Sequence, residues 1–254
     1  MPTAARPLRV LYKALHQLHP FELRFGRWSC PACGHRLHVR LRRDELAVRC
    51  TRCGASAISQ SIIDVVHRTC PDLAERRVLE LSAHGALARW LTTRAAEIVL
   101  SEYDADGVPG AIVDGVRNED VQQLTFPDGR FDLITSTEVF EHVADDARGF
   151  AEVHRALAPG GAFVFTVPLL DVAQTHERAT LREGQLLHLD TPEYHADAFT
   201  GSSRVLCFRD YGQDILERLL AAGFEQAWIA TPSLPLFGYA RKVLVARRRG
   251  TQSV

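Results

Sequence analysis

The chain has 254 residues, of which 46% are hydrophobic and 24% are charged, and its formal net charge is −1. This composition predicts a globular protein with one large domain, or a medium domain and a small one. The net charge argues against sequence-independent binding of polyanions by the whole chain. No apolar run reaches the roughly 18 residues of a transmembrane helix, and no signal-peptide core is present, so we expect a cytoplasmic protein.

Residues 7–18 place Leu8, Leu11, Leu15 and Leu18 at helical spacing. A helix that packs against its own protein explains this pattern better than contact with a membrane, because its cationic face is thin. We therefore expect a short amphipathic helix before the first cysteine motif.

Two C-x-x-C-G motifs follow, CPACG and CTRCG, with sixteen residues between Cys33 and Cys50. Each motif offers two thiolates to one tetrahedral metal, and its glycine lets the backbone amides turn toward the sulfurs. Two disulfides are the alternative, but they are not expected without a secretion signal. We predict a zinc ribbon with a hairpin over residues 37–41 and 46–48. Its ligands are Cys30, Cys33, Cys50 and Cys53.

The remaining cysteines, Cys70 and Cys207, stand alone and are predicted to be small buried hydrophobic residues. Residues 61–68 predict a helix that links the ribbon to the next segment, and Pro71 ends it. We place the domain boundary here, with residues 1–70 as the ribbon unit and residues 71–248 as the larger domain.

Short apolar runs alternate with helical patterns from residue 77 onward. Residues 78–81 predict a strand, and a helix begins at residue 86. Residues 97–102 and 118–121 predict the next two strands, and the glycine-rich stretch between them is expected to be a loop.

A complete strand–helix–strand unit follows. Residues 131–136 predict a buried strand, and residues 145–157 carry apolar positions at helical spacing. Pro159-Gly160-Gly161 ends that helix, and residues 162–167 predict a second apolar strand. Such a unit predicts a parallel sheet covered by helices.

These motifs resemble those of class I S-adenosylmethionine-dependent methyltransferases, closest to the branch that contains ubiquinone-biosynthesis O-methyltransferases. The resemblance covers residues 77–247 and is carried by Asp120, LTFPD-x-x-FD, EVFEHV and L-x-PGG with its following VP. It implies an α/β fold with a seven-stranded, doubly wound, Rossmann-like sheet. It also implies S-adenosylmethionine as the cofactor.

The resemblance further implies which residues hold the cofactor. The family's loop after the first strand reads approximately acid-x-G-x-G-x-G, and here Glu80 keeps the acid near the methionine end. Glu102 would accept from the ribose hydroxyls, although it could be an ordinary strand-end carboxylate. Asp120 would accept from the adenine amine, and the next backbone N–H would donate to a ring nitrogen. The predicted contacts are Glu80, Ser82, Gly85, Glu102, Asp120, Val121 and Ser136.

Two segments are candidates for the acceptor chemistry. Glu138, Glu141 and His142 form E-x-x-E-H, which resembles the divalent-cation motif of metal-dependent O-methyltransferases; packing at the helix start is the alternative. Residues 169–208 form a long insert that we expect to build the acceptor pocket, or else to be exposed polar loop. Within it His195 is the preferred general base, and His142 is a second candidate.

The chain ends with a predicted helix over residues 211–222, capped by Gly223, and strands over residues 225–231 and 242–247. The sequence therefore predicts a methyltransferase that acts on an oxygen of a small-molecule or sugar acceptor. One alternative is a protein that reuses the fold without transferring methyl groups, prompted by the short glycine loop. Another is a nucleic-acid methyltransferase that binds through arginines of the ribbon, namely Arg36, Arg40, Arg42, Arg43, Arg49 and Arg52.

Overall fold

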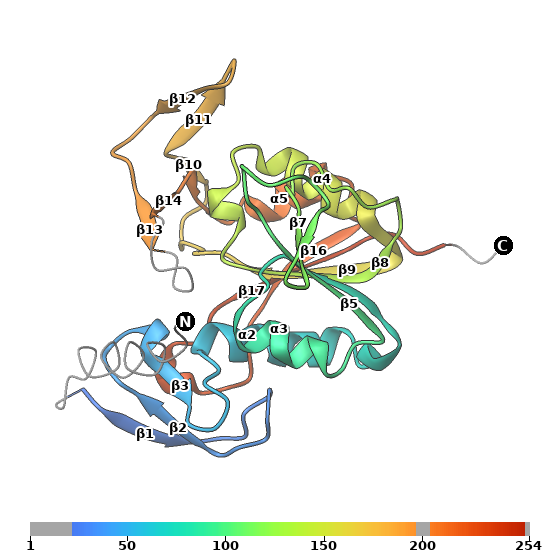
Figure 1. Cartoon of the computed structure of the whole chain (residues 1–254). Helices are drawn as coiled ribbons and strands as arrows, with labels where there is room; N and C mark the ends of the chain where they lie inside the picture. Colours follow the sequence, from blue (N-terminus) through green and yellow to red (C-terminus); the bar gives the residue numbers. More distant parts are fainter. Residues whose placement is uncertain (1–21, 197–203, 252–254) are drawn as a thin grey trace, which may run out of the picture.

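The computed structural model describes residues 22–196 and 204–251 (Figure 1). The helix predicted over residues 7–18 lies outside the described residues. In the part of the chain that is described, no helix combines the length and the apolar character needed to span a membrane.

The ribbon is a small antiparallel sheet of three strands. The predicted hairpin is present, although its second strand lies about two residues later than expected, and a strand before the first cysteine motif was not predicted. Asp44 caps the short 3₁₀ helix η1 between the hairpin strands by accepting a hydrogen bond from the Leu46 N–H. The elements are β1 (Arg24–Arg27), β2 (Leu37–Arg40), η1 (Glu45–Ala47) and β3 (Val48–Cys50).

The central sheet has eight strands in the order β16–β17–β9–β8–β4–β5–β7–β6. The five adjacent strands from β9 to β7 pair in parallel. On one side β17 pairs antiparallel with both β9 and β16, and on the other side β6 pairs antiparallel with β7. This confirms the predicted Rossmann-like sheet of seven strands, to which β6 adds an eighth. The strands are β4 (Arg77–Glu80), β5 (Glu97–Glu102), β6 (Ile112–Val113), β7 (Val116–Asn118), β8 (Phe131–Thr137), β9 (Leu157–Thr166), β16 (Gln226–Ala230) and β17 (Val243–Arg247).

The extra strand corrects two predictions about the stretch before Asp120. The expected loop contains a hairpin, whose turn residues Asp114 and Gly115 both have positive φ, 52° and 82°. Such a turn matches the twist of the strands that it joins. The third strand is therefore β7, at Val116–Asn118, and the prediction of residues 118–121 placed it too late.

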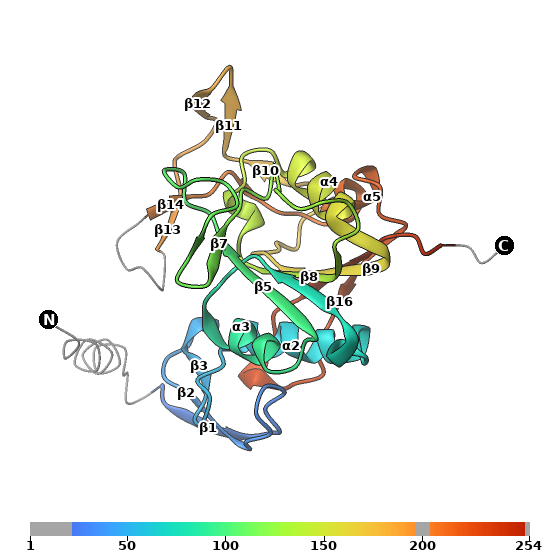
Figure 2. The ribbon, with the colours of Figure 1, turned by 45° about the vertical axis from the view of Figure 1, so that its right-hand side comes forward.

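Helices α2 and α3 lie on one face of the sheet, and α4 and α5 lie on the other (Figures 1 and 2). Because side chains alternate along a strand, Leu133 and Val164 face α2 and α3, whereas Ile134 and Phe163 face α4 and α5. Helix α2 precedes residue 70 yet packs in this core, and the domain boundary stays a prediction. The helices are α2 (Ala57–Thr69), α3 (Gly85–Thr92), α4 (Asp146–Ala156) and α5 (Ile215–Ala221), with the 3₁₀ helices η2 (Leu73–Glu75), η3 (Phe140–His142) and η4 (Leu236–Gly238).

The last helix begins later than residue 211, where the sequence placed it. Tyr211 is buried, and its hydroxyl donates to the Asp146 carboxylate at 3.0 Å. A Cβ on Gly212 would meet the carbonyl carbon of Gln174 at 2.5 Å, so this glycine allows two backbone segments to touch. These contacts hold the chain in a non-helical conformation until Ile215.

The described residues of the predicted insert take part in three short two-stranded sheets, in one of which β10 pairs with β15 just beyond the insert. The β11–β12 hairpin projects from the body of the molecule (Figure 1). Backbone contact joins the end of the insert to the turn after β8, since the Phe208 N–H donates to the Glu141 carbonyl at 2.7 Å. The strands are β10 (His176–Glu177), β11 (Ala179–Arg182), β12 (Gln185–His188), β13 (Tyr194–Ala196), β14 (Arg204–Leu206) and β15 (Arg209–Asp210).

The ribbon shares a small apolar core with the larger domain. Trp28 packs with Val48, with Ala57 of α2 and with Leu236 of η4. The Trp28 indole N–H donates to the side-chain oxygen of Gln60 at 3.0 Å, which pairs its polar atom inside this core. The ribbon is therefore packed on α2 and on the connection between β16 and β17.

Candidate functional site

The carboxyl ends of the parallel strands lie next to one another along one border of the sheet, which we call its carboxyl edge, and ligands bind there in open α/β sheets. Glu80 ends β4, Glu102 ends β5 and Thr137 ends β8. The loops that follow these strands therefore meet at this edge, and they carry most of the predicted cofactor contacts.

The Glu80 side chain is fully buried under this edge. The Thr135 hydroxyl donates a hydrogen bond to Oε2, whereas Oε1 has no hydrogen-bond partner. Burial raises the pKa of Glu80 to about 8, although hydrogen bonds from Thr135 and from the Ser82 backbone lower it. A buried acid with an unpaired oxygen fits a donor group such as the ammonium of S-adenosylmethionine.

Three hydroxyl groups on the neighbouring strands are also buried without a partner: Ser136 Oγ, Thr137 Oγ1 and Thr166 Oγ1. Strand pairing places Thr137 directly opposite Thr166. Because buried polar atoms are nearly always paired in native proteins, a group of unpaired ones at one edge marks a place that fits a polar ligand. Ser136, a predicted contact, belongs to this group.

The loop after β4 reaches the next strand end. Ser82 Oγ donates to the Thr137 carbonyl at 3.3 Å, and Gly85 begins α3 with a φ of 97°, which side chains avoid. His84 Nε2 lies 3.3 Å from Glu102 Oε1, and both side chains are partly exposed. The loop and Glu102 thus come together, as a ribose site requires. Sequence reasoning missed His84, whose one signal was the departure of this loop from the glycine pattern.

Asp120 and Val121 follow β7, and the Asp120 carboxylate already has a partner. It accepts from the backbone N–H of Gln122 at 2.8 Å and from the Gln122 side-chain amide at 3.0 Å. The side-chain oxygen of Gln122 accepts from the Asp145 N–H at 3.0 Å, while Val121 is buried in the core with Phe150 of α4. An adenine amine would therefore replace the Gln122 amide at Asp120.

The E-x-x-E-H segment turns sharply after β8. Glu138 has a φ of 53°, and its carboxylate pairs with Arg241, whose Nη2 also lies 3.2 Å from Oε1 of Glu45 in the ribbon. Glu141 keeps only 2% of its side chain exposed, and neither oxygen is hydrogen-bonded. Burial and the charge of Glu138 hold the pKa of Glu141 well above its ordinary value. The three predicted metal ligands are thus separated into two groups, because Glu138 pairs with an arginine whereas Glu141 faces His142.

The two candidate bases lie side by side. The His142 and His195 rings meet edge to face with centroids 5.0 Å apart, and Nδ1 of His195 is 3.9 Å from Glu141 Oε1. Cys207 Sγ lies 3.9 Å from His142 Nδ1. Burial lowers the pKa of His142, so its imidazole is neutral at pH 7. Cys207 is buried, as predicted, but no sequence pattern indicated its place beside the histidines.

Other polar residues of the insert pair with one another or with the residues directly after it. His176 Nε2 lies 2.9 Å from Asp190 Oδ2, and Arg178 Nε lies 2.7 Å from Asp210 Oδ2. His188 is exposed at the end of β12. These side chains build the insert itself, whereas His195 reaches the turn after β8.

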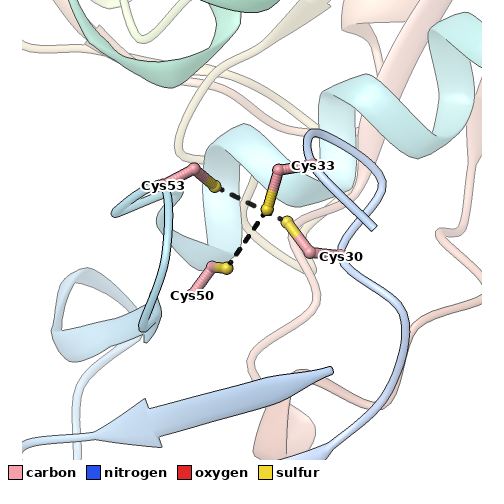
Figure 3. A group of neighbouring side chains, drawn as sticks. All are labelled: Cys30, Cys33, Cys50 and Cys53. Carbon is pink, nitrogen blue, oxygen red and sulfur yellow. Dashed lines mark hydrogen bonds between the residues drawn. The ribbon is translucent and has the colours of Figure 1, made fainter. Parts of the chain in front are cut away.

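The four motif cysteines converge on one point (Figure 3). Their sulfurs lie within 4.8 Å of one another, with 3.7 Å between Cys30 and Cys53 and between Cys33 and Cys50. These distances exclude disulfide bonds. A tetrahedral site with zinc–sulfur bonds of about 2.3 Å would separate the sulfurs by about 3.8 Å. The cluster is therefore compatible with the predicted zinc ribbon.

The six predicted ribbon arginines differ in exposure: Arg36, Arg43 and Arg52 are exposed, whereas Arg40, Arg42 and Arg49 are partly buried. Arg40 lies over the Phe237 ring, and Arg42 Nη2 pairs with Asp44 Oδ2 at 2.9 Å. Arg36 and Arg52 are exposed and line a shallow hollow beside Cys33. Only part of the predicted arginine cluster is thus both exposed and grouped at one place on the surface.

A family model described as a methyltransferase domain matches residues 21–218. The chain belongs to this family. Its sheet has the class I methyltransferase arrangement of parallel strands with an antiparallel pair at one edge.

Two curated relatives match part of this chain. It is 34% identical over 90 residues to a dimethylglycine N-methyltransferase of Parasynechococcus marenigrum, covering 33% of this chain and 32% of the relative. It is 31% identical over 170 residues to phthiotriol/phenolphthiotriol dimycocerosates methyltransferase 1 of Mycobacterium ulcerans, covering 58% and 61%. The matched segments thus span less than two thirds of either relative.

Among solved structures, the chain is similar to an S-adenosylmethionine-dependent methyltransferase from Mesorhizobium loti. The TM-score is 0.48 at 22% identity, over 74% of this chain and 98% of the other.

Proposed function

We propose that the protein transfers a methyl group from S-adenosylmethionine to an oxygen atom of a small-molecule or sugar acceptor. The observation that carries this proposal is the group of buried, unpaired polar atoms at the carboxyl edge of the sheet, which includes Glu80 Oε1 and Ser136 Oγ. The ammonium, hydroxyl and amine groups of S-adenosylmethionine are suitable partners for such atoms. Family membership supports the same cofactor.

In this proposal three carboxylates contact the cofactor, each at the carboxyl end of a different strand. Glu80 receives the ammonium, Glu102 the ribose hydroxyls and Asp120 the adenine amine. His84 and Gln122 now contact Glu102 and Asp120, so cofactor binding would displace both side chains. The remaining contacts come from Ser82, Gly85, the Val121 N–H and Ser136.

The reaction needs little covalent help because the donor is already a sulfonium. The acceptor oxygen attacks the methyl carbon in line with the sulfur–carbon bond, whose electron pair stays on sulfur and leaves a neutral thioether. The acceptor proton must leave during or before this step. His142 and His195 lie where the insert meets the turn after β8, and we assign the handling of this proton to that pair.

The proposal divides the chain into a ribbon unit, residues 1–70, and a methyltransferase unit, residues 71–248, with the acceptor insert at residues 169–208. A small acceptor is favoured over a nucleic acid because Arg40 and Arg42 are engaged within the protein. Of the six predicted arginines, Arg36, Arg43 and Arg52 are exposed, and three phosphate contacts release fewer counterions than six.

Isothermal titration calorimetry with S-adenosylmethionine and S-adenosylhomocysteine tests the cofactor assignment. Glu102→Gln removes a hydrogen-bonded charge and should weaken binding by about tenfold or more. Glu97→Gln is the matched control, because Glu97 lies at the opposite end of the same strand and should leave affinity unchanged. If the wild-type protein binds neither ligand, the proposed function is wrong. Methylation assays with hydroxylated small molecules and with RNA then separate the acceptor classes.

A further inference from the structure

The β11–β12 hairpin exposes leucine side chains on a segment that stands away from the rest of the molecule (Figures 1 and 2). Leu181 of β11 and Leu186 of β12 are 49% and 44% exposed, and Leu187 and Leu189 are exposed as well. Leu181 and Leu186 are paired across the hairpin, so their side chains lie on the same face. Neighbouring exposed apolar groups of this kind mark a surface that another molecule covers.

The hairpin is a regular structure with a fixed base. Its turn residues Glu183 and Gly184 have φ values of 52° and 77°, the left-handed conformation of a two-residue hairpin turn. At the base Ala179 is buried, and the N–H groups of Arg178 and Ala179 both donate to the Phe208 carbonyl. The leucines are therefore presented on a defined pair of strands rather than on an irregular loop.

One edge of β12 carries backbone groups that can accept a further strand. In the part of the chain that the structure describes, β12 pairs with β11 alone. The Leu189 N–H donates to the Arg178 carbonyl at 2.8 Å, so Leu189 faces the β11 side. Because the hydrogen-bonding direction alternates along an antiparallel strand, Leu187 also faces β11, whereas the N–H and C=O of Leu186 point outward.

The same edge has none of the usual features that prevent strand pairing. Natural proteins protect an exposed edge with lysine, proline or a bulge. Strand β12 reads QLLH, and its register with β11 is regular. A two-stranded hairpin alone is also only marginally stable in water, whereas further strands stabilise it. The open edge and the exposed leucines therefore call for the same kind of partner, which is another strand.

We infer that a second copy of this chain covers the hairpin, with β12 paired antiparallel to β12 of the other copy. A two-fold axis beside Leu186 sets its backbone N–H and C=O opposite those of Leu186 of the second copy, as their outward direction requires. Leu181 and Leu186 of both copies then form one row of four leucines on a single face of a four-stranded sheet.

The charges of the hairpin favour a second copy over an anionic partner. Strand β12 contains no carboxylate, lysine or arginine, so pairing it with itself brings no like charges together. Residues 179–190 contain one arginine and no lysine. The hairpin thus lacks the cluster of basic side chains that an anionic membrane surface attracts.

This association does not depend on the proposed function, because it rests on a strand edge and not on the cofactor site. Each strand of the joint has four residues, and interfaces below about 1,200 Å² are typically weak. We therefore expect monomer and dimer to exchange as the protein concentration changes.

Sedimentation velocity of the zinc-loaded full chain, over about a hundredfold range of protein concentration, tests the inference. The wild-type protein should shift from monomer toward dimer as the concentration rises. Leu186→Lys places two cations opposite one another at the axis and should remain monomeric. Leu220→Lys, at an exposed leucine of α5, is the matched control and should dimerise as the wild type does. Circular dichroism checks that both variants are folded.

A cysteine variant gives a second readout, which reports the register. Hydrogen-bonded antiparallel pairs have Cα atoms about 5.5 Å apart, a separation that a disulfide bond spans. Leu186→Cys should therefore form a disulfide-linked dimer under mild oxidation, whereas Leu220→Cys and the wild type should not.

Three results would overturn the inference. The first is a wild-type protein that stays monomeric at every concentration. The second is a dimer that Leu186→Lys leaves intact, since the interface would then lie elsewhere. The third is a monomer that binds vesicles of neutral phosphatidylcholine and loses this binding in Leu186→Lys, since lipid would then cover the leucines in place of a second copy.

Discussion

Replacing Glu80 by glutamine should stabilise the protein at neutral pH and weaken the dependence of its stability on pH. The wild-type side chain is fully buried, and burial raises its pKa from 4.5 to about 8. A folded-state pKa above the unfolded value means that the folded protein binds the proton more tightly. Glu80 therefore contributes most stability below pH 4.5, and this contribution is lost as the pH rises to 8.

The magnitude follows from the same pKa change. Between the two pKa values the carboxyl group is ionised in the unfolded state but protonated in the folded state, so the free energy of unfolding falls by about 1.36 kcal/mol for each pH unit. Between pH 5 and pH 8 the folded protein therefore loses about 4 kcal/mol of stability. Glutamine has a similar size and keeps an oxygen that can accept from the Thr135 hydroxyl, but it cannot ionise. The variant should therefore not lose this stability as the pH rises, whereas the other titrating groups should change the stability of both proteins equally.

Urea denaturation of the zinc-loaded protein at pH 5, 6, 7 and 8 measures the difference. The free energy of unfolding of Glu80→Gln should rise relative to wild type by about 4 kcal/mol across this range. Glu75→Gln, which removes an exposed carboxyl group just before β4, is the matched control and should follow the wild-type profile. A constant difference between Glu80→Gln and wild type would refute the reasoning.

Three further outcomes are expected. If the cofactor ammonium pairs with Glu80, binding of S-adenosylmethionine near pH 7 should release a proton, seen by calorimetry in buffers of different ionisation enthalpy and absent in Glu80→Gln. Arg241→Met should destabilise the protein by about 3 kcal/mol in urea, because two partly buried carboxylates lose their partner, whereas Glu45→Gln should cost about 1 kcal/mol or less. Cys50→Ser should lower the melting temperature in differential scanning fluorimetry by more than about 5 °C, and an unchanged value would argue against structural zinc.

The sheet was predictable because its signals are local. The strand–helix–strand unit around Asp145 carries its own periodicity and stop signals, and Asp145 caps α4 by accepting from the Arg148 N–H. The β6–β7 hairpin had a signal as well, since Asp114-Gly115 lies between β-branched residues. It was missed because three glycines and a proline in that stretch favoured a loop.

The grouping of side chains at the site was not predictable in the same way. His142 and Cys207 are 65 positions apart, so no periodicity relates them. The late start of α5 likewise depends on the contact between Gly212 and the Gln174 backbone, which exists only in the folded chain. Propensity decides local structure, but such contacts are decided by how the insert folds back onto the sheet.

The ribbon is connected to the site through Arg241, and this bears on what the ribbon does. The Arg241 backbone N–H donates to the Ser61 hydroxyl of α2, while its guanidinium bridges Glu45 of the ribbon and Glu138, the residue directly after β8. Glu138 has positive φ, a strained conformation that persists when surrounding contacts fix it. Since the turn after β8 also carries Glu141 and its histidine neighbour, a ribbon that holds Arg241 in place also supports the turn to which we assign the acceptor. Bracing the site therefore accounts for the position of the ribbon without requiring that it bind a nucleic acid.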